Sequence, residues 1–285
     1  MRYRNIILSL FISITFSQTQ VVIVEEMFMD APYVGEFTTT NTKYASDNLF
    51  KQEMQIEVGS FLVRMAMGGN KKAGSIIDGN SKLRTVYDIN EEEYAEENFQ
   101  SIIENDGKPK LKMMDNAFGG GSSRNSNEDE NEDEDSSENN ESDDNDVDNN
   151  EVNRTINNNF EKIGEFLAKK VTTEMMGRSG RVVIEEWFTM DTSLFSYALD
   201  VESKLVSSYG GSAQTTPRSF SEPMLRSAGH EFESVEGRLV KYKMTQKDDD
   251  DGFKMSWEIK QAKKEPFNQS DFILSKDYKK VDELN

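Results

Sequence analysis

The chain has 285 residues, with 53 acidic side chains against 33 basic ones and no cysteine. The lack of cysteine excludes disulfides, thiolate metal sites and cysteine nucleophiles. The basic residues form no cluster of the kind that contacts phosphate groups, so nucleic acid is not an expected partner.

The first 17 residues have the pattern of a signal peptide. Two arginines in MRYRN precede the 11-residue apolar run IILSLFISITF, and small residues stand at the third and the last position before Gln18. A membrane-spanning helix needs roughly 20 apolar residues, so we expect cleavage after Ser17, with an uncleaved anchor as the alternative. Residues 18–285 are then expected to be periplasmic or secreted, with no lipidated cysteine and no transmembrane segment.

Apolar residues from 51 to 88 recur mainly at every second position, which is typical of half-buried strands. The pattern predicts strands over 51–58 and 61–67, and a hairpin over 74–89 that turns at the sequence DGN. The strand over 61–67 is expected to place four side chains on one face: Phe61, Val63, Met65 and Met67. Strands joined by short polar turns indicate an antiparallel sheet that is apolar on one face.

Three segments are predicted to be helical. Residues 91–104 are acidic and loosely amphipathic, residues 193–211 follow an Asp-Thr pair and end at two glycines, and residues 221–229 begin with Ser-Glu-Pro and end at glycine. Residues 160–175 fit the period of a helix and that of a strand, so periodicity leaves both alternatives open there.

An acidic run interrupts the chain near its middle. Residues 125–153 hold 14 Asp and Glu and no Lys or Arg, so this segment accounts for most of the net charge. Low hydrophobicity and like charge predict a disordered segment over about 117–153. A calcium loop starting at Asp144 would need Gly at Asn149 and Glu at Thr155. Both positions fail, so no metal site is expected there.

The clearest strand signals lie near the C-terminus. Residues 181–190 form one predicted strand, and residues 236–261 form a long hairpin whose turn contains four aspartates. Alternation within the hairpin places six apolar side chains on one face: Val240, Tyr242, Met244, Phe253, Met255 and Trp257. These six are the candidate ligand-binding residues.

No constellation for catalysis stands out. His230 is the single histidine and no G-x-S-x-G pattern accompanies it, while the glycine-rich segments lack the Lys-Ser/Thr ending of a phosphate loop. We therefore expect no enzyme, no catalytic residue, no metal and no cofactor. The strand-face methionines have two readings, core packing or a pliable apolar groove: Met54, Met65, Met67, Met190, Met244 and Met255.

The order of the segments resembles that of a known family. The stretch 61–97, with its Arg-Met strand, its strand ending in Asp and its strand leading to Tyr, resembles an uncharacterised family of exported bacterial proteins. So do IGEFLAKKVTTEM, VVIEEWFTMD, HEFESVEGRLVKYKM and the closing PFNQSDFILSKDYKKVD, although Ser275, Lys276 and Asp277 replace the usual Pro and Gly. This family is similar to the LolA-like lipoprotein-carrier superfamily.

The resemblance implies a mainly β fold: a curved antiparallel sheet, or incomplete barrel, packed on a few helices. It favours a strand over residues 165–175. With the resemblance on both sides of the acidic run, residues 18–285 are expected to be a single β domain that the run interrupts.

Two functions follow as expectations. The first is a non-enzymatic carrier or binding module that holds a lipid or acyl chain in an apolar groove of the half-barrel. The second is a cell-envelope structural or interaction protein with a filled core, in which the acidic loop faces an envelope protein partner.

Overall fold

The computed structural model describes residues 18–32, 35–66, 68–113, 152–177, 180–212, 218–227, 229–230, 232–247 and 252–284. The predicted signal peptide and Met67 lie outside these residues, and so does the acidic run except for Val152 and Asn153, of which Asn153 begins a strand.

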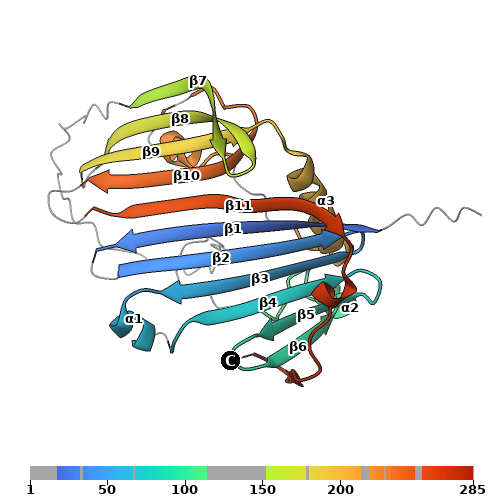
Figure 1. Ribbon diagram of the computed structural model, residues 1–285. Coiled ribbons are helices and arrows are strands. Elements are labelled where there is room, and N and C mark those ends of the chain that lie inside the picture. Colours follow the sequence, from blue (N-terminus) through green and yellow to red (C-terminus); the bar gives the residue numbers. More distant parts are fainter. Residues whose placement is uncertain are drawn as a thin grey trace, which may run out of the picture.

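The described residues are mainly β and form one open, antiparallel twelve-stranded sheet with a few helices (Figure 1). The strand order is β12-β6-β5-β4-β3-β2-β1-β11-β10-β9-β8-β7, so β1 and β11 meet at the centre. The one parallel pair is the short contact of β12 with β6. The strands are β1 Thr19–Ala31, β2 Gly35–Ser46, β3 Leu49–Val58, β4 Lys71–Asp78, β5 Leu83–Asp88, β6 Glu93–Asn98, β7 Asn153–Ile163, β8 Phe166–Gly177, β9 Gly180–Thr189, β10 Arg238–Lys247, β11 Lys254–Pro266 and β12 Lys279–Lys280.

Several predicted elements are confirmed. The strands over 51–58 and 181–190 and both hairpins form as β3, β9, β4–β5 and β10–β11. Residues 160–175, which periodicity left open, are strand, because Gly164 with φ +55° turns β7 directly into β8. The helices predicted over 193–211 and 221–229 form as α3 (Ser193–Ser208) and α4 (Ser221–Ser227).

The strand predicted over 61–67 is wrong, because Phe61–Ala66 form the short helix α1. The β3–β4 register pairs Ile56 with Lys71, and β3 ends at Val58, so residues 61–66 lie in the connection of a hairpin and have no strand to pair with. The Arg64 amide donates to the Ser60 carbonyl (2.9 Å), and Gly68 and Gly69 turn the chain back at positive φ.

The helix predicted over 91–104 is wrong in its first half. Glu93–Asn98 form β6, which pairs with β5 and buries Ala95, and the helix α2 covers only Phe99–Glu104. The Asn98 side chain accepts a hydrogen bond from the Ser101 amide (2.8 Å), which starts the helix at that point. Pairing at the sheet edge overrides the helical preference of the acidic residues.

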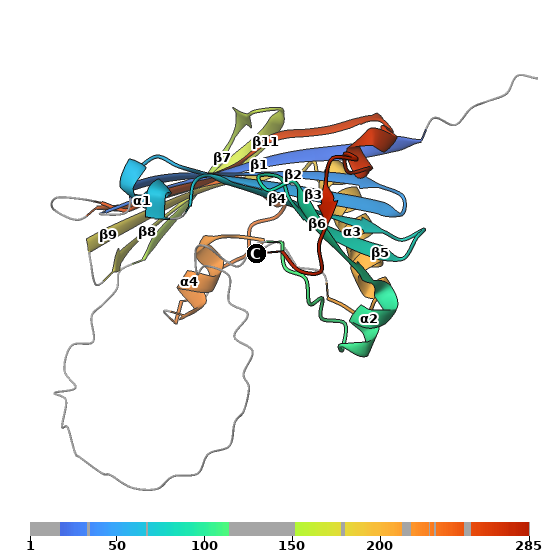
Figure 2. The ribbon, with the colours of Figure 1, turned by 90° about the horizontal axis from the view of Figure 1, so that it is seen from below.

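The helices α2, α3 and α4 lie on the same side of the sheet (Figure 2). α3 crosses β1, β2, β3 and β11 and buries Phe195, Ala198, Val201 and Leu205 against them. At one end β10 diverges from β11, since their ladder covers only Lys241–Thr245. Buried side chains of both halves of the sheet fill the space around α3 and form the main core: Val21, Ile23, Phe50, Ile77, Phe166, Trp187, Val240 and Ile259.

A close backbone contact joins the end of α2 to the end of α3. Gly107 has φ +72°, and a Cβ built there would lie 2.1 Å from the Gly210 carbonyl oxygen. We expect Gly107→Ala to lower the free energy of unfolding by at least about 2 kcal/mol, because it adds a backbone clash to the cost of a left-handed alanine. Gly229→Ala is the matched control, with φ +79° and open space around it. Equal urea midpoints for the two variants would contradict the expectation.

Candidate functional site

One face of the sheet carries a row of opposed apolar side chains, here called the methionine row. From β9 to β3, the strand registers place these residues side by side: Ile184, Met244, Met255, Met29, Phe37 and Val58. Directly opposed residues of antiparallel strands point to the same face. Met29 is an even number of residues from Val21 and Ile23 along β1, so its side chain points to the same face as theirs. Val21 and Ile23 contact α3 in the main core. The methionine row therefore lies on the face that carries the helices.

A second row lies beside the first and is called the aromatic row. Its members on β10, β11, β1, β2 and β3 are Tyr242, Trp257, Met27, Thr39 and Ile56. The ends of both rows are buried, but Met244, Met255, Met29, Met27 and Trp257 in the middle are only half-buried. Flexible thioethers in this position form an adaptable apolar floor.

The structure brings four of the six candidate residues together on this floor: Tyr242, Met244, Met255 and Trp257. Val240 lies apart, because a bulge between Leu239 and Lys241 turns it into the main core, where it is fully buried. Phe253 precedes β11 and is half-buried, and its carbonyl accepts a hydrogen bond from the Gln246 amide (2.9 Å).

Sequence reasoning missed Met27, Met29 and Phe37, which complete the floor. They lie on β1 and β2, where no strand was predicted. The alternation of Met27 and Met29 with Phe28 and Asp30 was a usable signal, but it is short.

Polar side chains bound the floor on the side of α3. Glu25 lies between the core residues and the methionines of β1, and it accepts hydrogen bonds from Asn41 Nδ2 and Lys43 Nζ, both at 3.1 Å. Glu202 of α3 faces this group, and burial raises the pKa of its carboxyl, with Lys43 opposing the shift. The apolar floor therefore ends at a polar wall.

The segment before α4 covers the opposite end of the floor. The Phe220 ring stacks on Tyr242 with centroids 4.1 Å apart and planes 12° apart, and Tyr242 in turn lies 6.1 Å from Trp257. These contacts leave Tyr242 only 8% exposed.

A buried carboxylate holds this segment in place. Glu186 lies opposite Tyr242 and is fully buried. Its Oε1 accepts hydrogen bonds from Ser219 Oγ (2.8 Å), the Phe220 amide (2.6 Å) and the Ser221 amide (3.2 Å), and its Oε2 accepts one from Ser221 Oγ. Four donors around one carboxylate fix the position of α4 over the sheet.

The buried phenol of Tyr242 predicts a dependence of stability on pH. Burial raises its pKa to about 12, whereas an unfolded tyrosine has a pKa of about 10. Between these values the unfolded chain binds fewer protons, so the free energy of unfolding falls as pH rises through this window. Relative to Tyr242→Phe, the unaltered protein is expected to lose about 2 kcal/mol between about pH 9 and pH 12 in urea titrations. Parallel pH profiles would contradict this.

An exposed apolar tip lies where the methionine row ends at β3. Phe61, Leu62 and Met65 of α1 are 66%, 71% and 65% exposed, and Arg64 places its guanidinium 5.9 Å from the Phe61 ring. Val63 packs inward against the cluster that contains Phe37 and Val58. The tip is therefore continuous with the end of the row.

The described residues contain neither a cluster of metal ligands nor a helix that could span a membrane. Within the described ranges, His, Asp and Glu side chains form no group of three that could hold a metal ion. No helix in the described part of the chain has the length and hydropathy needed to cross a membrane.

The likeness of this chain to known proteins is weak and structural. No protein-family model and no curated protein matches this sequence. Among solved structures, a LolA superfamily protein from Nitrosomonas europaea matches over 92% of this chain and 93% of its own, with 10% sequence identity and a TM-score of 0.22. A likeness of this strength carries no functional argument, so function must be inferred from the residues of the site.

Proposed function

We propose that this protein is an exported, non-enzymatic binding module for a lipid or another ligand with an acyl chain. The supporting observation is the half-buried middle of the methionine and aromatic rows, on the face that also carries α3 and α4. An acyl chain laid across these rows would gain roughly 0.8 kcal/mol for each CH₂ removed from water. Such binding requires only that the acyl chain is buried. It needs no reacting group, and the two rows consist mainly of apolar side chains.

Native extraction tests the proposal directly. The protein, purified from its own cell envelope without detergent, is expected to carry lipid that mass spectrometry detects after solvent extraction. After the lipid is removed, the protein should take up a fluorescent fatty acid in a saturable way. If no lipid is extracted and no fatty acid binds, the proposal is wrong.

A second candidate function is an envelope interaction protein with a filled core. The observation that favours it is the stacking of Phe220 on Tyr242, which covers their end of the floor and leaves Tyr242 only 8% exposed. Deleting residues 125–150 separates the two candidates. Fatty-acid binding is expected to survive this deletion, whereas a partner held by the acidic run would be lost from a pull-down.

The apolar tip is proposed to contact the lipid surface from which the ligand is taken. Phe61→Ser with Leu62→Ser is expected to slow fatty-acid transfer from phosphatidylcholine–phosphatidylglycerol vesicles several-fold and to leave the Kd for free fatty acid unchanged. The physical reason is that these exposed side chains can enter the interface without unfolding. Ile273→Ser is the control, because Ile273 is another exposed apolar residue. Equal transfer rates for both variants would contradict the role.

A further inference from the structure

A pocket of about 350 Å³ lies between α4 and the edge strand β7. It is called the α4 pocket, and its lining residues are Arg154, Glu222, Leu225, Arg226, His230 and Phe232. Leu225 and Phe232 supply an apolar wall, and two arginines and a histidine supply nitrogen donors. A volume of this size is at the lower end of the range of small-molecule sites.

The charges of the α4 pocket are not balanced among its lining residues. Arg226 pairs with Glu222 one helical turn away, with Nη2 and Oε1 2.7 Å apart. No carboxylate of the described residues lies within ion-pairing distance of Arg154, whose guanidinium carbon lies 5.6 Å from the centroid of the Phe232 ring. Among the described residues, the pocket therefore has one guanidinium whose charge is not paired with a carboxylate.

The Arg154 side chain is also half-buried, and one of its hydrogen-bond donors has no acceptor among the described residues. From Asn153 to Phe160, β7 is exposed at every residue except Arg154. Its Nε is buried and has no hydrogen-bond partner among the described residues. A buried donor without an acceptor costs free energy, and an oxyanion in the pocket would remove this cost.

The strand registers connect the α4 pocket to the methionine row. Arg154 lies opposite Thr173, and Thr173 lies opposite Ile184, which begins the methionine row. Arg154 and Met244 are thus three strand spacings apart on one face, about 14 Å.

We propose that the α4 pocket binds a carboxylate or phosphate group, and that the ligand of this protein is an anionic amphiphile. This inference rests on the proposed function for the apolar part of the ligand. The planar guanidinium of Arg154 donates two parallel hydrogen bonds to such a group, which a neutral ester or alcohol cannot accept as a charge-assisted pair. Arg226 and His230 supply further donors, and Phe232 stacks against the guanidinium.

The test compares two probes with the same alkyl chain, dodecanoate and methyl dodecanoate, by displacement of a fluorescent fatty acid. The unaltered protein is expected to bind dodecanoate more tightly. Arg154→Gln is expected to raise the Kd of dodecanoate about tenfold, the loss of one charge-assisted pair, and to leave that of methyl dodecanoate unchanged. If the ratio of the Kd of methyl dodecanoate to that of dodecanoate is the same in Arg154→Gln as in the unaltered protein, the inference is overturned.

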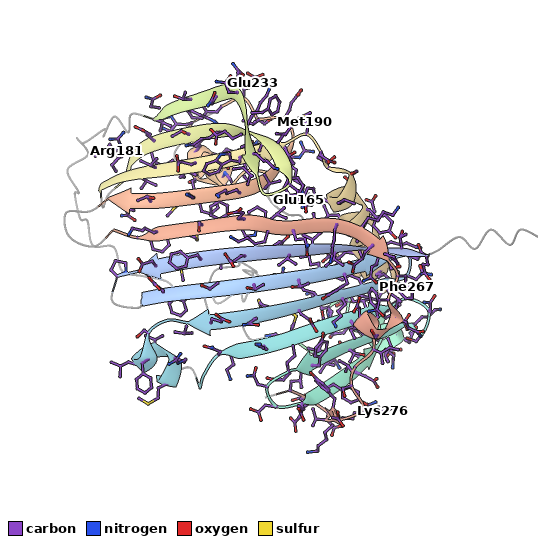
Figure 3. The ribbon with its side chains drawn as sticks, in the orientation of Figure 1. Glu165, Arg181, Met190, Glu233, Phe267 and Lys276 are labelled. Carbon is purple, nitrogen blue, oxygen red and sulfur yellow. The ribbon has the colours of Figure 1, made fainter. Side chains whose placement is uncertain are left out.

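Arg181→Gln is the matched control. Arg181 lies at the beginning of β9 (Figure 3), and its ion pair with Glu174 shows that its charge is already compensated. This variant is expected to bind both probes as the unaltered protein does. Thermal unfolding of both variants checks that they are folded.

Failure of the proposed function gives a different result. If neither alkyl probe binds, the apolar floor is not a ligand site, and inorganic phosphate becomes the probe of the α4 pocket alone. A saturable shift of the Arg154 Nε–H NMR signal on adding phosphate would then support a site for a water-soluble anion and overturn the amphiphile. An unshifted signal would overturn the anion site itself.

Discussion

Glu186→Ala is expected to lower the free energy of unfolding by about 3–5 kcal/mol, the largest stability effect predicted for this protein. The substitution removes the acceptor of four hydrogen bonds and leaves donors at Ser219, Phe220 and Ser221 buried without partners. Glu186→Gln keeps one acceptor oxygen and turns an NH₂ group toward the same donors, so a loss of about 2–3 kcal/mol is expected. Urea unfolding followed by circular dichroism measures both.

Glu185→Gln is the control for these variants. Glu185 is the adjacent residue on β9, points to the other face and forms a partly exposed ion pair with Lys170. A pair of this kind contributes about 0–1 kcal/mol. Hydrogen exchange adds a local readout, because amides of α4 should lose protection in Glu186→Gln and keep it in Glu185→Gln. Similar urea midpoints for the two glutamine variants would show that Glu186 does not hold α4.

Met255→Gln is expected to have the largest effect on ligand binding. Met255 lies at the middle of the methionine row, between Met244 and Met29. Glutamine is close to methionine in size, but an acyl chain over this position would bury its amide without a partner, at a cost of about 1–3 kcal/mol. The Kd for a fluorescent fatty acid should therefore rise about tenfold or more.

Met190→Gln provides the same chemical change at a distance. Met190 is 59% exposed and follows the last residue of β9, at the end of that strand opposite to Arg181 (Figure 3). Its substitution should leave the Kd unchanged. Both variants are expected to unfold near the midpoint of the unaltered protein, because neither methionine is fully buried. A Kd that is equal in Met190→Gln and Met255→Gln would remove the methionine row as the ligand site.

The hairpin of β10 and β11 was predictable because its apolar residues alternate strictly and its turn is acidic. The observed pairing of Tyr242 with Trp257 and of Met244 with Met255 follows from that alternation. The sequence could not show the bulge at Val240, which depends on the neighbouring strand β9. A single extra residue moves this side chain from the floor to the main core.

The strands β1 and β2 were harder to predict than the hairpin of β10 and β11. β2 contains the run Thr38–Thr40 and few apolar residues, and β1 carries Glu25 and Glu26 in its middle. Their pairing depends on partners at a distance in sequence, which periodicity within one segment does not report. Glu186 was also indistinguishable from the other acidic residues, because its role arises only when α4 packs over β9.

The pairing of β1 with β11 places Gln20 opposite Glu265 at the centre of the sheet. This contact joins segments 245 residues apart in sequence, so the fold has a high contact order and should form slowly. The ladder can form only after β11 has been synthesised, and until then β1–β6 and β7–β10 each have an unpaired inner edge, on β1 and on β10. The centre of the sheet is therefore the part that closes last, after all the other long strands have been made.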